Sequence, residues 1–196
     1  MRGLVRVGAA VPSLALGNVK ENMKRHLAMM REAKEKHVSI VTFPELSLTG
    51  YTCGDLFFQR RLLDDVTDAL LALKDEMPEG ILAVVGAPLE IEGALYNCAV
   101  VLHKGEIISA VPKTFLPNNG EFYEKRWFQS GDARRDASVA IPKLKTDVCR
   151  QAIFETEDGV RFGIELCEDL WAPLPPSTML SVEGAEIILN LSASNE

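Results

Sequence analysis

Residues 38–45 read VSIVTFPE, a short apolar run rich in β-branched residues that ends in a Pro-Glu pair. Such a run beside a chain breaker predicts a buried β-strand that ends at Phe43. Two similar runs, VRVGAA at 5–10 and ILAVVG at 81–86, predict one strand before it and one after it. These three segments are the framework from which the rest of the chain is interpreted.

Two amphipathic helices are expected between these strands. Residues 18–37 carry apolar side chains at intervals of three and four, with Asn18 as a helix cap and Glu21 three residues later. Residues 56–77 repeat the pattern and end at the breaker sequence Pro-Glu-Gly of 78–80. Strand, helix, strand, helix, strand is the order of an α/β fold with helices packed on a sheet.

The second half of the chain changes in character. Two β-hairpins are expected, at 96–111 around the turn HKGE and at 153–166 around the turn EDG. Between them, residues 113–136 show no sustained period, which is typical of a long loop lying over a site. A short helix within 173–184 and a final strand at 186–191 follow.

The composition indicates one globular domain of 196 residues, 47% of them hydrophobic and 25% charged. No apolar run reaches the ~18 residues of a membrane span, and the N-terminus lacks the order of a signal peptide, so we expect a cytoplasmic protein. A formal charge of −7 without any basic block argues against a nucleic-acid partner. The cysteines form no C-x-x-C pair and the histidines no H-x-x-x-H pair, so no metal site is expected.

Three chemically reactive residues share one context, because each lies at or just after the end of an expected strand: Glu45, Lys113 and Cys167. Strand ends on one edge of a sheet converge on a shared crevice, so we expect these side chains to lie close together. Taken singly, each has an ordinary structural interpretation: a solvated carboxylate, an exposed amine and a packed thiol. Packing is the role that we expect for Cys98 and Cys149.

Together these three side chains can hydrolyse an amide. A buried carboxylate can take the proton of a thiol, protonate the leaving amine and then activate water, a role that suits Glu45. A fixed ammonium and a backbone N–H can stabilise the oxyanion, by about 3 kcal/mol per donor, roles that suit Lys113 and the N–H of Glu168. Cys167 is then the nucleophile. No histidine lies at a strand end, so a Cys-His pair is the weaker alternative.

Several stretches of the sequence resemble a known family. FPEL at 43–46, PKTFLP at 112–117 and ELCED at 165–169 are similar to the three signature blocks of the nitrilase, or carbon–nitrogen hydrolase, superfamily, with Glu, Lys and Cys in the family's order. Further stretches resemble the amino-terminal glutaminase domain of glutamine-dependent NAD+ synthetases, and these are 48–57, 121–128, 171–177 and 190–196. The likeness covers essentially the whole chain.

The resemblance implies a nitrilase-like α-β-β-α sandwich that hydrolyses glutamine to glutamate and ammonia through a thioester on Cys167. It implies Glu45 as the base, Lys113 as the transition-state stabiliser and Glu121 as a supporting second glutamate. Five further positions are expected to contact the substrate: Tyr51, Asn119, Glu168, Trp171 and Ser194. The family commonly has Tyr at the position of Asn119, so the hydrogen bond of that Tyr to the substrate must be made differently here.

The resemblance also implies a partner. In the family, ammonia passes to a second, synthetase domain that uses ATP and Mg²⁺ to amidate deamido-NAD, whereas the glutaminase domain itself needs no cofactor. Residues 1–196 contain no Gly-rich phosphate loop of such a domain. The family's sandwich continues beyond a segment like the Ser-Ala-Ser of 192–194, so we expect 1–196 to be a nitrilase domain that is C-terminally truncated.

Two alternatives stay open. The first is a free-standing carbon–nitrogen hydrolase, such as an amidase or an N-carbamoyl hydrolase. The second is a catalytically silent fragment that acts as an assembly module. Because the superfamily associates through helix faces, the resemblance also implies a homo-oligomer, with the helices at 18–37 and 175–184 as contact surfaces.

Overall fold

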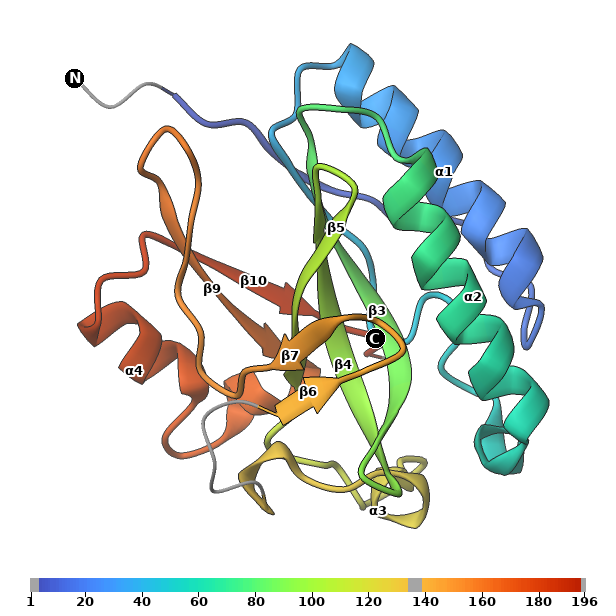
Figure 1. Cartoon of the computed structure of the whole chain (residues 1–196). Coiled ribbons are helices and arrows are strands. Elements are labelled where there is room, and N and C mark those ends of the chain that lie inside the picture. The colour runs from blue at the N-terminus through green and yellow to red at the C-terminus, as the bar shows by residue number, and fades with distance from the viewer. Residues whose placement is uncertain (1–3, 134–138, 195–196) are drawn as a thin grey trace.

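The computed structural model describes residues 4–133 and 139–194, which form four layers (Figure 1). A seven-stranded sheet has the order β1-β2-β3-β4-β5-β7-β6, and a three-stranded sheet has the order β10-β9-β8. Helices α1 and α2 cover one face of the large sheet, the small sheet packs on its other face, and α4 lies outside the small sheet. The expected α-β-β-α sandwich is therefore confirmed.

The first three strands run parallel, as the expected α/β order requires. They are β1 (Val7–Ala9), β2 (Ile40–Thr42) and β3 (Leu82–Ile91). Strand β3 is longer than expected, because the sequence from Gly86 onward contains glycine and proline, which we interpreted as the end of a strand. In the structure β3 continues and pairs with β4 along its whole length.

Helices α1 (Val19–Glu35) and α2 (Arg60–Glu76) lie between these strands. The expected cap of α1 is confirmed, because Asn18 Oδ1 accepts a hydrogen bond from the Glu21 N–H at 3.2 Å. The expected helix at 56–77 begins later than predicted, because Gly54–Phe58 form a separate 3₁₀ helix that buries the ring of Phe57.

Strands β4 (Ala94–His103) and β5 (Glu106–Pro112) form the first expected hairpin. Lys104 and Gly105 both have positive φ at its tip, which suits a tight turn between twisted strands. The loop at 113–136 contains an unexpected short helix, α3 (Glu124–Trp127), and a 3₁₀ helix at Gly131–Ala133; its residues 134–136 lie outside the described part.

The remaining elements complete both sheets. Strands β6 (Val139–Ile141) and β7 (Thr146–Val148) extend the large sheet beyond β5; their three-residue length left no pattern that predicted them. The second expected hairpin and the final helix and strand are confirmed. They are β8 (Phe154–Glu155), β9 (Arg161–Leu166), α4 (Pro176–Val182) and β10 (Ile187–Leu191).

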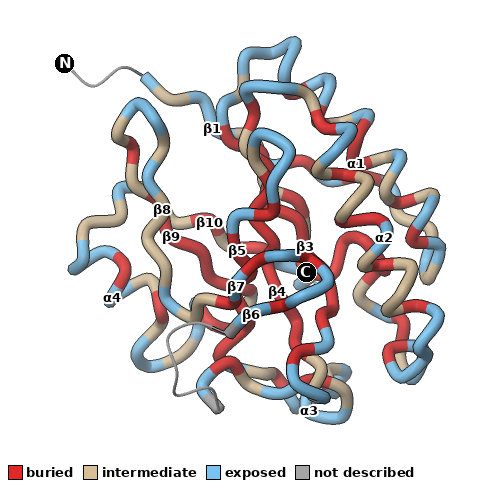
Figure 2. Tube along the Cα trace, viewed as in Figure 1, coloured by how far each residue is buried: buried red, intermediate tan, exposed pale blue. Residues whose placement is uncertain are grey.

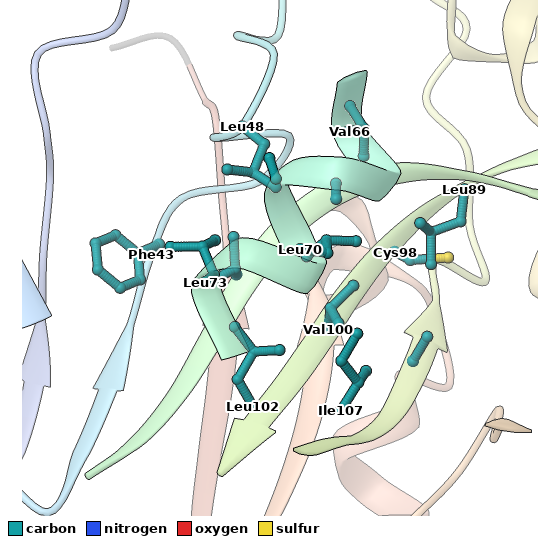
Figure 3. Close-up of a cluster of buried hydrophobic side chains, with 14 of the residues drawn as sticks. Phe43, Leu48, Val66, Leu70, Leu73, Leu89, Cys98, Val100, Leu102 and Ile107 are labelled. Atoms are coloured by element: carbon teal, nitrogen blue, oxygen red, sulfur yellow. The ribbon is translucent and has the colours of Figure 1, made fainter. Parts of the chain in front are cut away.

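Side chains along the central strands point alternately to the two faces of the large sheet, and this divides the core into two parts. On β4, Cys98, Val100 and Leu102 face the helices, whereas Ala99 and Val101 face the small sheet. Figure 3 shows side chains of α2 lying against this helix-facing side, and Figure 2 shows the buried strands at the centre of the molecule. Since both faces are buried, the central strands are mostly apolar. Within the described ranges, no helix is long and apolar enough to cross a membrane.

A buried polar network fixes α1 to the segment after β2. His26 is fully buried, and its Nδ1–H donates to the Asn22 carbonyl at 2.7 Å while Nε2 accepts from the Ser47 hydroxyl at 2.8 Å. The Asn22 side-chain amide in turn donates to the carbonyl oxygens of Ala15 and Leu48. These bonds use both ring nitrogens of a neutral imidazole.

This network predicts acid sensitivity. Burial lowers the pKa of His26 from 6.5 to about 4. Between these two values the unfolded chain binds a proton at His26 and the folded chain does not. The stabilising effect is present above pH 6.5 and is lost as the pH falls toward 4. The free energy of unfolding of the wild type should fall between pH 7 and pH 4.5. In His26→Gln this fall should be smaller by about 2 kcal/mol, measured by urea denaturation. A pH dependence in His26→Gln equal to that of the wild type would contradict the prediction.

Candidate active site

A glycine on β3 allows the segment that carries Glu45 to cross directly over the sheet. Phe43 N–H donates to the Val84 carbonyl at 2.9 Å, and Leu48 N–H donates to the Gly86 carbonyl at 3.1 Å. A Cβ atom on Gly86 would lie 2.3 Å from the Pro44 carbonyl oxygen. Only a residue without a side chain permits this approach, which turns Glu45 into the interior.

Lys113 lies directly after β5 and is held at both ends. Its backbone N–H donates to the Asn97 carbonyl on β4 at 2.8 Å. Its Nζ lies 2.6 Å from Glu45 Oε1 and 2.6 Å from Glu124 Oε1, and the side chain is completely buried. Two of the three predicted reactive residues, Glu45 and Lys113, are therefore in direct contact.

The second carboxylate at this ammonium is Glu124, and the expectation for Glu121 is wrong. Glu121 is exposed, whereas Glu124 is 1% exposed and accepts a hydrogen bond from the Tyr51 hydroxyl at 2.6 Å. The two glutamates are three residues apart in the same stretch, EFYEKRW. Glu124 differs from Glu121 because it is the first residue of the short helix α3, and this residue faces inward.

Exposed hydrogen bonds to Asp55, here called the Asp55 clamp, hold α3 in place. Arg126 donates to Asp55 through Nε and Nη2, both at 2.7 Å, and Trp127 Nε1 donates to the same carboxylate at 2.9 Å. Behind the Asp55 clamp, the Phe57 ring lies 5.8 Å from the Trp127 ring. Two stretches that resembled the synthetase family therefore meet in space, and their contact fixes the helix that carries Glu124.

The electrostatics of this cluster suit proton transfer. Burial raises the pKa of Glu45, and the neighbouring carboxylate of Glu124 raises it further, against the opposing effects of Lys113 and Asn97. Burial alone would lower the pKa of Lys113, but the two carboxylates outweigh it and the pKa is raised. Glu45 Oε2 is buried and has no hydrogen-bond partner among the described residues, so this oxygen is available to a proton.

Cys167 directly follows β9, in a strained turn. Its φ is +43°, which is unusual for a residue with a side chain, and a 3₁₀ helix (Cys167–Trp171) follows at once. The thiol is half-buried and its Sγ lies 3.5 Å from the Ser194 hydroxyl. Burial and Glu124 raise the pKa of Tyr51, and the charges of Glu45 and Cys167 raise it further.

Asp169 fastens the Cys167 turn to the strand end of Lys113. Its Oδ1 accepts hydrogen bonds from the N–H groups of Thr114 at 3.0 Å and Phe115 at 2.7 Å. Its Oδ2 accepts from the Leu166 N–H at 3.0 Å. Burial raises the pKa of Asp169 to about 6, against these three N–H donors and Lys113. Asp169, to which the sequence analysis assigned no role, therefore joins the strand ends that carry Lys113 and Cys167.

The expected substrate contacts lie in different places. Glu168 and Trp171 line a cavity of ≈ 410 Å³ beside Phe115 and Lys125, and Trp171 is 75% exposed. Ser194 lies beside the Cys167 thiol, and Tyr51 belongs to the carboxylate cluster.

Asn119 is exposed in the loop before α3. Residues 195 and 196, which close one of the family-like stretches, lie outside the described part. Among the residues that are described, no group of three or more His, Cys, Asp or Glu side chains is arranged to hold a metal ion.

The chain is similar to known proteins over nearly its whole length. Residues 6–196 match the carbon–nitrogen hydrolase family. The chain is 37% identical over 195 residues to the glutamine-dependent NAD(+) synthetase of Mycobacterium bovis, covering 98% of this chain and 29% of that protein. The structure of a glutamine-dependent NAD(+) synthetase from Cytophaga hutchinsonii has a TM-score of 0.83 at 29% identity, over 97% of this chain and 30% of that one.

A more distant structure shares the fold alone. An amidase from Nesterenkonia sp. has a TM-score of 0.75 at 17% identity, and the match covers 98% of this chain and 66% of the amidase. The present chain spans less than a third of the length of the synthetases it matches. Because the family match extends over nearly every residue, the chain belongs to the carbon–nitrogen hydrolase family.

Proposed function

We propose that this protein hydrolyses glutamine to glutamate and ammonia through a thioester on Cys167. The observation that carries the proposal is the buried cluster of Glu45, Lys113 and Glu124, with one unpartnered oxygen on Glu45. Glutamine as the substrate is supported by the 37% identity to proteins named glutamine-dependent NAD(+) synthetases.

The first half of the reaction forms the thioester. Glu45 Oε2 takes the proton of the Cys167 thiol, and the thiolate attacks the carboxamide carbon of glutamine. Two of the three Nζ–H donors of Lys113 are directed at carboxylates, which leaves the third for the oxyanion, together with the N–H of Glu168. Glu45 then gives its proton to the nitrogen, the C–N bond breaks, and ammonia leaves.

The second half releases glutamate. Glu45 takes a proton from water, the resulting hydroxide attacks the thioester carbon, and the same donors stabilise the new oxyanion. The C–S bond breaks and the thiolate recovers the proton from Glu45, which restores the starting state. A raised pKa of Glu45 favours this shuttle, because it brings the base closer in proton affinity to the thiol.

We further propose that the ammonia supplies a synthetase domain, which uses ATP and Mg²⁺ to amidate deamido-NAD in the cytoplasm. The names of the relatives and their greater length support this partner. Self-association is proposed through α1 and α4. The exposed apolar side chains of α4 support this, since Met179 is 40% and Val182 is 77% exposed.

The proposed reaction is tested by incubating the purified chain with glutamine and measuring glutamate. We expect glutamate formation by the wild type, none above background in Cys167→Ala, and wild-type rates in Cys149→Ala, a control at another half-buried free cysteine. A simple aliphatic amide and an N-carbamoyl amino acid serve as competing substrates. Hydrolysis of either of these without hydrolysis of glutamine, or activity that survives in Cys167→Ala, would contradict the proposal.

A further inference from the structure

We infer that Asn97 is a positioning residue that fixes which oxygen of Glu45 exchanges a proton with Cys167. The reaction described above does not use Asn97, and its place in the middle of β4, away from any strand end, gave no signal in the sequence. The side chain is completely buried and lies on the same face of the strand as Ala99 and Val101, toward the small sheet that carries Cys167. The inference rests on the proposed role of Glu45 as the base.

Asn97 contacts all three charged members of the cluster. Its amide nitrogen donates to Glu45 Oε1 at 2.8 Å and lies 3.4 Å from Glu124 Oε2. Its carbonyl oxygen on the main chain accepts from the Lys113 N–H at 2.8 Å. A primary amide has two N–H groups, so one side chain can serve both carboxylates.

These contacts make the two oxygens of Glu45 unequal. Oε1 receives two donors, from Asn97 and from Lys113 Nζ, whereas Oε2 receives none although it is buried. Hydrogen bonds to one oxygen of a carboxylate withdraw charge from it and hold the group against rotation. The proton taken from the thiol therefore goes to Oε2, and the carboxylate presents that oxygen in every cycle.

The orientation of the Asn97 amide follows from the same contacts. A rotation by 180° would place Oδ1 against two carboxylates, which offer it no donor. In the observed orientation Oδ1 is buried without a hydrogen-bond partner among the described residues. Unsatisfied acceptors are unfavourable in a core. A leucine of similar size would avoid that penalty, so stability alone does not explain an asparagine at this position.

The test measures the reactivity of the thiol and needs no substrate. The rate at which iodoacetamide alkylates Cys167 is followed by mass spectrometry from pH 4 to pH 9. With Glu45 as the base, this rate rises as Glu45 loses its proton. Removing the donor in Asn97→Leu should move the midpoint upward by about one pH unit and lower the plateau rate about tenfold, because Glu45 loses a charge-assisted hydrogen bond and its orientation.

Controls separate this role from packing and from the proposed reaction. Ser109→Ala removes a buried donor to the Asp147 carbonyl on the same sheet and should leave the midpoint unchanged. Asn97→Ser, which keeps a shorter hydroxyl, should shift the midpoint in the same direction and serves if the leucine variant does not fold.

An unchanged or lower midpoint in a folded Asn97 variant would overturn the inference. A midpoint that persists in Glu45→Gln would instead refute Glu45 as the base, and so would tell failure of the proposed reaction apart from failure of the role of Asn97.

Discussion

Lys113→Met will abolish glutamate formation and lower the free energy of unfolding at pH 8 by about 3–5 kcal/mol. Methionine matches the length of lysine and fills its buried space, so the loss comes from charge. Without the ammonium, Glu45 and Glu124 lose the cation that lies 2.6 Å from each of them. One unpaired buried carboxylate is costly, and two carboxylates at one site repel each other as well.

The sign of the pH dependence distinguishes this explanation from simple loss of packing. In Lys113→Met, burial and the neighbouring carboxylate raise the pKa of Glu45 further in the folded state, because the opposing ammonium is gone. The folded variant therefore binds more protons than the unfolded chain, and its stability falls as the pH rises above about 4.5. Urea denaturation at pH 5 and pH 8 measures this.

The deficit relative to wild type should be smaller at pH 5. The control is Lys143→Met, which removes a lysine that is 68% exposed and lies 3.5 Å from Asp64. It should cost less than about 1 kcal/mol at either pH. A deficit in Lys113→Met that does not change with pH would contradict the electrostatic explanation.

Gly86→Ala will displace the base and lower the rate of glutamate formation by more than about 100-fold, because a 1 Å misplacement of a reacting group has an effect of that size. The new Cβ would lie 2.3 Å from the Pro44 carbonyl oxygen and 2.4 Å from the Leu46 nitrogen. Both are backbone atoms, so no side chain can rotate away. The segment must lift off β3, which breaks the hydrogen bonds that Phe43 and Leu48 make to the strand.

The stability of this variant should fall by about 3 kcal/mol, a value at the upper end for single substitutions. The matched control is Gly8→Ala on β1, where the atoms nearest to the new Cβ belong to the Val38 side chain, the closest at 3.2 Å. Urea denaturation and the glutamate assay should show little change in that control. Equal effects of the two substitutions would show that the close crossing at Gly86 is not what positions Glu45.

The sequence predicted the parts of the site that follow strand ends. Glu45, Lys113 and Cys167 each lie where an apolar run stops, and the parallel order of β1 to β3 could be inferred from alternating periods. Residues that act from other places left no such pattern. Asn97 lies in mid-strand, where an isolated polar residue among apolar ones carries no sign of its partners.

The error at the second glutamate has a similar cause. Whether Glu121 or Glu124 faces the core depends on where a single helical turn begins, and that turn is set by the distant Asp55. Long-range contacts also explain the late start of α2, since the ring of Phe57 is drawn into the core beside Phe128. Local periodicity contains no information about such tertiary contacts.

Asp169 has a consequence for redesign of the protein. Its carboxylate accepts hydrogen bonds from the main-chain N–H groups of Thr114 and Phe115. These bonds do not depend on which side chains occupy the two positions. The same two residues line the cavity beside Glu168 and Trp171. Substitutions at these two positions should therefore change the wall of that cavity and leave in place the hydrogen bonds that join the Cys167 turn to the end of β5.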